Sequence, residues 1–331
     1  MLKKSTIVAI AGSLIVGGIG LSTVGLALGG ESSVHFDSFL ELSEPTFEKE
    51  YSQKIIEAQS ELRMTMDREE KLDTGEVKQK GWEKLDGFSE MKVEVGTVDF
   101  NVVIGEDYKI EVDVKTNVDL SYDIRGEKLY IKQKNIEQYR RNNGFRSNLN
   151  DGTITVMIPQ DAKLEEVILN LGVGEGHLEG ITVNELEISN GVGSMNINNV
   201  VANNAHITGG VGDIKVEDFK VKGVVFDSGV GDLNVTSLVS DRLEANMGVG
   251  DVSIQGDIQG DIEIGGGLGS LRLELVGQEK DYNYFISRGG GHITINEMNQ
   301  FGLGDVKVNN NSQYNIEIEA GLGEILIKTD K

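Results

Sequence analysis

The chain has 331 residues, with 31 basic and 54 acidic side chains and a formal net charge of -23. So acidic a chain is a poor partner for nucleic acid, because cationic contacts to phosphate dominate that binding. The absence of cysteine excludes disulfides, thiolate metal sites, cysteine nucleophiles and a lipoprotein anchor, and 43 glycines with only 2 prolines exclude collagen.

The first thirty residues predict a membrane anchor. Lys3 and Lys4 precede a stretch without charge from residue 5 to residue 30. An apolar span of about 20 residues crosses a bilayer as a helix, whereas a signal-peptide core has about 7 to 15 residues. Because such lysines stay in the cytoplasm, we expect residues 1–30 to be an uncleaved single-pass anchor in the cell membrane, with the remaining chain outside. The alternative, a long cleaved signal peptide, also places that chain outside.

Residues 31–85 predict a polar stalk. Apolar side chains follow Pro45 at steps of three and four residues, which is the spacing of an amphipathic helix. They are Phe47, Tyr51, Ile55, Ala58, Leu62 and Met66. We interpret this helix as a spacer folded against the main domain. The alternative is docking on a partner or on the membrane surface, although its glutamates disfavour an anionic membrane.

Alternation of apolar and polar residues begins near Met91 and predicts strands at "MKVEV", "YKIEVDV", "KLYIKQ" and "TITVMI". Between the last two, residues 135–150 are polar and include Arg140, Arg141 and Arg146. We interpret this basic segment as a surface loop. A contact for an anionic envelope polymer or a lipid headgroup is the alternative.

A glycine triplet, Gly-Val-Gly or Gly-Leu-Gly, recurs every nineteen residues from Gly172 to Gly267 and again from Gly302 to Gly321. Such self-similarity is the signature of a repeat fold. We expect the glycines to provide a sharp turn with positive φ and a close approach of neighbouring coils that leaves no room for Cβ. These turn glycines are Gly172, Gly174, Gly191, Gly193, Gly210, Gly212, Gly229, Gly231, Gly248, Gly250, Gly267, Gly269, Gly302, Gly304, Gly321 and Gly323.

Apolar residues also recur at fixed places in each repeat. Counted from the first glycine, they stand one, four, six, fourteen and sixteen residues on, and the residues between are mostly polar. One such unit cannot bury its apolar face, but stacked coils about 4.8 Å apart bury a continuous ladder. We therefore predict an all-β fold, a β-solenoid of about nine 19-residue coils over residues 86–331, preceded by a transmembrane helix (1–30) and a short helical stalk (31–85).

An acidic residue often stands three places after the first glycine, as at Asp213, Asp232 and Asp251. Stacked coils would align these carboxylates as a like-charge ladder, which calcium bridges well through oxygen ligands. The known calcium-binding roll, however, repeats every nine residues. We interpret these residues as turn formers and keep a calcium ladder as the alternative.

No nucleotide-binding glycine loop or serine-nucleophile elbow is present, and His35, His177, His206 and His292 lack metal-ligand spacing. A lyase built on a β-helix would need a basic or histidine side chain beside carboxylates on one face. Its nearest candidates are Arg242 and Arg272, which stand in different columns of the repeat. We expect no catalytic residue and no cofactor.

The repeat is interrupted between Gly267 and Gly302, where "VGQEKDYNYFISR" predicts a bulged loop. We expect its aromatic residues to fill the coil, with outward contacts as the alternative; they are Tyr282, Tyr284 and Phe285. The last coil, "EILIKTDK", predicts an open edge. Lys328 and Lys331 either block that edge, or it stacks end to end with another copy.

Three stretches carry a resemblance to a known family: "ITVMIPQDAKLEEVILNLGVGEGHLEGI", the "GVGDIKV" type of coil, and the closing "GLGEILIKT". From about Phe88 to the end, the chain resembles the bacterial DUF4097 family of adhesin-like β-strand-repeat proteins. Its anchor ending "GLALGG" looks like those of Gram-positive members. The resemblance implies a β-solenoid on the cell envelope, some relatives being linked to envelope stress and antimicrobial peptides, and it supplies no catalytic motif.

Three hypotheses about function follow. The first is a non-enzymatic, membrane-anchored envelope protein that acts in envelope stress or as a scaffold and binds a membrane protein or a wall polymer. The second is a surface adhesin, with or without calcium stiffening. The third is a glycan-active enzyme on a β-helix.

Overall fold

The computed structural model describes residues 81–115, 118–134, 151–301 and 304–330. Apart from one 3-10 helix, η3 (Glu279–Asp281), the regular structure in these ranges is all β. The strands are β1 (Glu83–Lys84), β2 (Glu90–Val95), β3 (Asp99–Gly105), β4 (Lys109–Val114), β5 (Leu120–Arg125), β6 (Lys128–Gln133), β7 (Gly152–Pro159), β8 (Lys163–Val173), β9 (Gly176–Glu179), β10 (Thr182–Val192), β11 (Met195–Val211), β12 (Ile214–Val230), β13 (Leu233–Val249), β14 (Val252–Ile258), β15 (Ile262–Leu268), β16 (Leu271–Gln278), β17 (Tyr282–Ile295), β18 (Met298–Phe301), β19 (Val306–Val308) and β20 (Tyr314–Asp330). The prediction of an all-β fold is confirmed for this part of the chain.

The anchor predicted at residues 1–30 and the amphipathic helix predicted at residues 47–66 lie outside the described residues. Within the described ranges, no helix is long and apolar enough to cross a membrane. The last residues of the predicted stalk belong to the β-domain, because β1 starts at Glu83 and pairs with β4.

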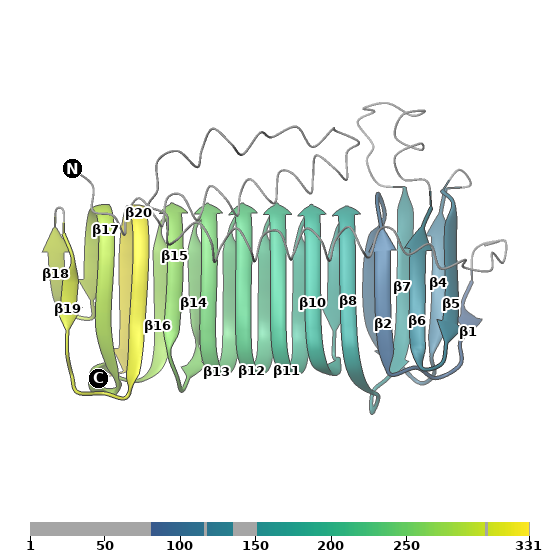
Figure 1. Ribbon diagram of the computed structural model, residues 1–331, viewed down its shortest axis with the longest axis horizontal. Coiled ribbons are helices and arrows are strands. Elements are labelled where there is room, and N and C mark those ends of the chain that lie inside the picture. Colours follow the sequence, from purple (N-terminus) through teal and green to yellow (C-terminus); the bar gives the residue numbers. More distant parts are fainter. Residues whose placement is uncertain (1–80, 116–117, 135–150, 302–303, 331) are drawn as a thin grey trace, which may run out of the picture.

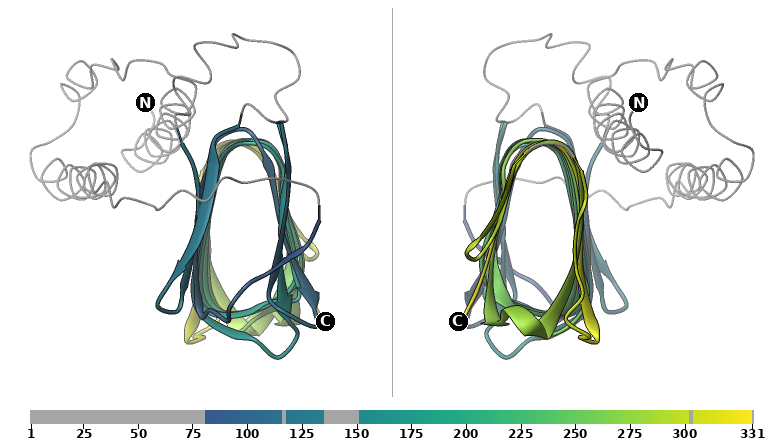
Figure 2. Two further views of the ribbon diagram at one scale, coloured as in Figure 1. Left: turned by 90° about the vertical axis from the view of Figure 1, so that its right-hand side faces the viewer. Right: turned by 90° about the vertical axis from the view of Figure 1, so that its left-hand side faces the viewer.

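Neighbouring strands in the middle of the molecule pair in parallel, nineteen residues apart. Ile207 of β11, for example, pairs with Ile188 of β10 and with Phe226 of β12. Figure 1 shows the strands side by side along the long axis, and Figure 2 shows that they close into a flattened tube. Alternating sequences form this tube because every second side chain points inward, where the stacked coils exclude water.

The core consists of apolar ladders inside the tube. In one ladder, Ile207, Phe226 and Ala245 are all completely buried and lie in adjacent coils. Burial of one large apolar side chain stabilises the fold by about 1.5–3 kcal/mol relative to its exposure. Ala245 is small and lies beside the large Phe226, so a large side chain in one coil is matched by a small one in the next.

Each regular coil turns at a second corner as well as at the glycine triplet. Asn199, Asp218 and Ser237 have φ of 51°, 51° and 56°, and Gly180 has 76°. All four stand eight residues after the first glycine of a triplet, and three of them are types that adopt the left-handed conformation readily. The residue pattern predicted two short alternating segments separated by turns in each repeat. It did not identify the residues of this corner, although their run of Gly, Asn, Asp and Ser was a readable signal.

The last strand of the chain lies inside the stack. β20 pairs with β15 and β16 on one side and with β17 on the other. The outer coil is therefore β17, and the prediction of an open edge at "EILIKTDK" is wrong. Lys328 lies 3.4 Å from Glu274 of β16 and so faces a neighbouring coil. The partners of β20 stand 54 and 32 residues away in sequence, so a count of nine equal coils is not confirmed here.

Antiparallel strands cover both ends of the tube. At one end β4 pairs with β7 and β5 with β6, and β1 pairs with β4. At the other end β18 and β19 both pair with β17. The two outermost parallel coils are therefore each followed by strands that run the opposite way.

The segment predicted as a bulged loop forms the end of β16, η3 and the start of β17. Tyr282 and Tyr284 are buried inside the coil, as predicted. The Tyr282 hydroxyl donates a 2.6 Å hydrogen bond to the carbonyl of Ile258, and burial raises the pKa of Tyr282 to about 12. Phe285 instead lies on the outer wall with 36% exposure, which corrects the prediction that it fills the coil.

Candidate functional site: an aliphatic ridge at the glycine corner

The two glycines of a triplet form the corner in different ways. The second glycine has positive φ in every described triplet, for example +136° at Gly231 and +145° at Gly250. The first glycine does not have positive φ, but it leaves no room for a side chain. A Cβ on Gly248, for example, would lie 2.3 Å from the carbonyl oxygen of Gly229 in the coil before it. Of the sixteen predicted turn glycines, Gly302 lies outside the described residues.

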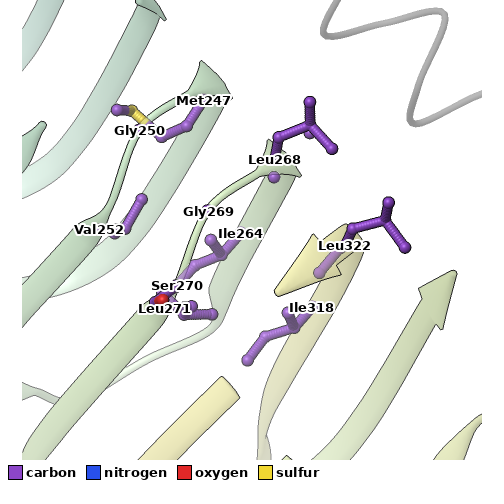
Figure 3. Close-up of a pocket in the computed structure, with 13 residues that line it drawn as sticks. Met247, Gly250, Val252, Ile264, Leu268, Gly269, Ser270, Leu271, Ile318 and Leu322 are labelled. Atoms are coloured by element: carbon purple, nitrogen blue, oxygen red, sulfur yellow. The ribbon is translucent and has the colours of Figure 1, made fainter. Parts of the chain in front are cut away.

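The middle residue projects outward from this corner in four of the described triplets, whereas Val173 of the first triplet is buried. Exposure is 42% at Val230, 46% at Val249, 51% at Leu268 and 57% at Leu322. In Figure 3, Leu268 and Leu322 point to the same side of the sheet, whereas Ile264 and Ile318 point to the other. The sequence grouped this column with the buried ones, and for these four residues the structure corrects that grouping.

These middle residues align along the rod. Each pairs in register with its counterpart in the next coil, and Leu268 pairs with Leu322 of the inserted strand β20. We call this line the corner ridge; it consists of Val192, Val211, Val230, Val249, Leu268 and Leu322, the first two being half-buried. Aliphatic side chains that line up on a surface differ from scattered ones, because contiguous apolar patches mark interaction sites.

The predicted calcium candidates flank the ridge. The Asp213 Oδ1 atom accepts a 3.0 Å hydrogen bond from the amide of Asp232, and the Asp232 Oδ1 atom accepts one of 2.8 Å from the amide of Asp251. Asp251 in turn accepts one of 2.7 Å from the amide of Ser270. Each carboxylate thus caps the next coil, and no group of three histidine or acidic side chains able to hold a metal ion occurs in the described part of the chain. This geometry supports the turn-forming interpretation and leaves the calcium ladder as a prediction.

One wall beside the ridge carries a histidine that is hydrogen-bonded to an aspartate of the next coil. The His206 ring lies 2.7 Å from a carboxylate oxygen of Asp227, which also accepts a 3.0 Å hydrogen bond from Asn246. The hydrogen bond to Asp227 and the nearby Glu187 and Glu244 raise the pKa of His206 above 6.5. The pair therefore links the neighbouring strands β11 and β12 by a hydrogen bond.

The two arginines considered for catalysis do not come together. Arg242 pairs with Glu263 at 3.1 Å on one wall of the tube, and Arg272 pairs with Glu274 on the other. His177 lies 3.4 Å from Glu179, a position distinct from that of His206. The structure therefore does not assemble these candidates into a site.

The cavity beneath the ridge is too small for a ligand. It has a volume of about 20 Å³ and is lined by apolar side chains that include Met247, Ile264 and Ile318 (Figure 3). Such a volume holds about one water molecule. Binding at this corner must therefore use its outer surface.

The basic segment at residues 135–150 lies outside the described residues. The chain leaves the described part at Lys134 and returns at Asp151, whose amide donates a 2.8 Å hydrogen bond to the carbonyl of Thr97. Thr97 occupies the glycine-corner position of its coil, because Gly96 contacts Gly172. The segment is thus inserted at the same corner that carries the ridge.

Comparisons with known proteins found several similar solved structures and one family. No curated protein matches the chain. A proposed adhesin from Bacteroides fragilis has 15% identity and a TM-score of 0.41, covering 75% of this chain and 95% of its own. A proposed lipid-binding protein from Parabacteroides distasonis has 14% identity and a TM-score of 0.34, covering 76% and 96%. A proposed cell adhesion protein from Clostridium sporogenes has 16% identity and a TM-score of 0.23, covering 76% and 98%.

The family model described as Toastrack DUF4097 matches residues 88–328. These residues begin just before β2 and include nearly all of β20, so the match spans the stacked coils and the end strands other than β1. The chain therefore belongs to the Toastrack DUF4097 family.

Proposed function

We propose that this protein is a non-enzymatic component of the cell envelope that binds a partner through the corner ridge. Residues 5–30 anchor it in the membrane, and the solenoid stands outside the cell as a rigid support. The partner is an envelope protein or a wall polymer, and envelope stress is the process in which such binding acts. The observation that carries the proposal is the alignment of exposed aliphatic side chains along the ridge.

The outer walls contrast with the ridge. Their charged side chains form ion pairs within the molecule, for example Lys215 with Glu217 at 2.9 Å and Arg242 with Glu263 at 3.1 Å. A partner must break such pairs or accommodate them. Val249 and Leu268, by contrast, are about half exposed, and their burial would gain roughly 25 cal/mol for each Å² of apolar surface removed from water. The ridge therefore offers a continuous line of apolar surface for binding, whereas exposed aliphatic residues elsewhere, such as Val239 and Val276, do not belong to that line.

A charge substitution on the ridge tests the proposal. Full-length protein with Val249→Asp and Leu268→Asp is compared with wild type for retention on isolated cell envelopes, both proteins being held in lipid nanodiscs so that the membrane anchor does not contribute to retention. The control carries Asn234→Asp and Ser253→Asp, which add the same charge to the outer wall of neighbouring coils. We expect several-fold weaker retention for the ridge variant and unchanged retention for the control, since the ridge side chains are exposed and the fold tolerates both changes.

Two other outcomes contradict the proposal. Equal retention of the ridge variant and wild type would show that the ridge is not the binding surface. Ridge-dependent binding to foreign cell surfaces, with no retention on the cell's own envelope, would establish the adhesin hypothesis in its place.

A further inference from the structure

The corner ridge is long and narrow. It spans six coils from Val192 to Leu322, which at about 4.8 Å per step is roughly 24 Å. A line of aliphatic side chains of this length suits one α-helix with a single apolar stripe. A flat apolar face would suit a sheet or a broad protein surface better.

The chain itself contains a segment of that kind. Residues 47–66 carry apolar side chains at steps of three and four, and as a helix they would extend about 30 Å. The acid-rich surroundings of the ridge repel this segment only weakly, because Lys49, Lys54 and Arg63 offset most of its four glutamates. Its length and its stripe therefore both match the ridge.

The connection to the solenoid is long enough for the segment to reach the ridge. The described chain begins at Gly81, beside β1, and residues 67–80 span at most about 46 Å when extended. The strands between β1 and the ridge pair in the order β1, β4, β7, β3, β9, β11 and β12. These six steps correspond to roughly 29 Å along the rod. Val211, the last residue of β11, lies just before β12 in the chain. Met66 can thus lie near Val211, with the helix running toward Leu322.

We infer that residues 47–66 form an amphipathic helix that lies along the corner ridge and covers it until a partner displaces it. The inference rests on the proposed function of the ridge and adds its regulation. A tethered segment has a high effective concentration at its site, so a partner must compete with it. Presentation of the ridge then depends on the stalk, which joins the solenoid to the membrane anchor.

The absence of cysteine allows a direct test, because single cysteines can be placed at will in the full-length protein in lipid nanodiscs. Labelling of Leu268→Cys by a bulky maleimide is measured in the otherwise wild-type chain and in a chain with Tyr51→Asp, Ile55→Asp and Leu62→Asp. We expect several-fold faster labelling when the apolar stripe is disrupted. A cysteine at Asn234 on the outer wall should react equally fast in both chains.

A crosslinking experiment identifies what covers the ridge. We expect Ile55→Cys and Val249→Cys to crosslink within one chain, and Ile55→Cys with Asn234→Cys to crosslink far less. Crosslinks between chains would overturn the inference in favour of a second copy. Equal labelling in both chains without a ridge crosslink would overturn it as well. If envelope retention still depended on the ridge in that case, the proposed function would stand and only the self-docking would fail.

Discussion

At the residue scale, the glycine corner depends on backbone that other residues cannot reproduce. The second glycine of a triplet combines positive φ with contact to the coil before it: Gly250 has φ +145°, and its Cβ would lie 1.9 Å from the carbonyl oxygen of Gly231. Gly266 in the same region has nothing within 4 Å of an added Cβ and is not among the glycines with positive φ. A glycine in the turn between β13 and β14 and a glycine within β15 therefore have opposite tolerance to substitution.

We predict that Gly250→Ala lowers the free energy of unfolding by at least about 2 kcal/mol, because strain and a backbone clash add together. Gly266→Ala should change it by no more than about 0.5 kcal/mol or stabilise the protein slightly. Urea unfolding followed by circular dichroism measures both. Equal losses would show that the corner does not depend on the conformation of the second glycine.

The aspartates beside the ridge lead to a second prediction at this scale. Loss of the capping carboxylate in Asp232→Ala should cost about 1 kcal/mol, whereas Asp232→Asn keeps an oxygen acceptor and should cost less. Because the amide of Asp251 is the bonded group, neither value should depend on calcium. A chelator should leave the melting temperature of the wild type unchanged. A clear fall in that temperature would instead establish the calcium ladder.

At the scale of elements, the position of β20 decides how the C-terminal end holds together. Ile316 of β20 is fully buried and pairs with Ile262 of β15 on one side and with Tyr284 of β17 on the other. Among the described residues, the backbone of β17 pairs with the stack of coils through β20, and its other pairings are with β18 and β19. The seventeen residues of β20 therefore join two parts of the molecule that precede them in the chain.

We predict that a chain ending at Gln313 loses order from Leu271 onward, while the coils between Gly172 and Gly248 persist. Limited proteolysis with mass spectrometry should find new cleavage sites in residues 271–313 of this variant only. A chain lacking just Lys331 is the control and should resist like the wild type. Global unfolding of the truncated chain would show that the coils form one cooperative unit, against the local behaviour expected of stacked repeats.

At the scale of the whole molecule, the tube ends in antiparallel strands at both sides. A long parallel coil with an exposed edge would act as a template for another copy, and short strands of opposite direction reduce that hazard. Strands β18 and β19 have 4 and 3 residues. At the other end, β5 carries an ion pair between Arg125 and Asp123 at 3.0 Å. These features oppose the end-to-end stacking proposed from the sequence, which remains a prediction.

We predict that the full-length protein in detergent sediments with one mass over a wide concentration range. The chain ending at Gln313 is the matched comparison, because loss of β20 exposes the edge of β15 and this chain should associate as concentration rises. Analytical ultracentrifugation distinguishes the two. A wild-type chain that grows into longer rods would support end-to-end stacking instead.

The sequence by itself determined the repeat, the parallel stacking and the buried ladders. Triplets such as those at Gly210 and Gly229 recur at a constant spacing, and each coil contacts only its neighbours, so local pattern and fold coincide. Buried columns such as Ile207 and Phe226 were read correctly for the same reason. Along the chain, alternation indicates which side chains point inward wherever the backbone stays extended.

Only the tertiary structure decided which way the corner residues point and how the ends are built. At the glycine corner the alternation is broken by positive φ, so the middle residue of the triplet, for example Leu268, turns outward although its type and spacing match the core. The insertion of β20 between β16 and β17 is a pairing of segments far apart in sequence, and no local period records it. The candidate site and the end of the rod were therefore settled by contacts between coils, which the repeat alone does not specify.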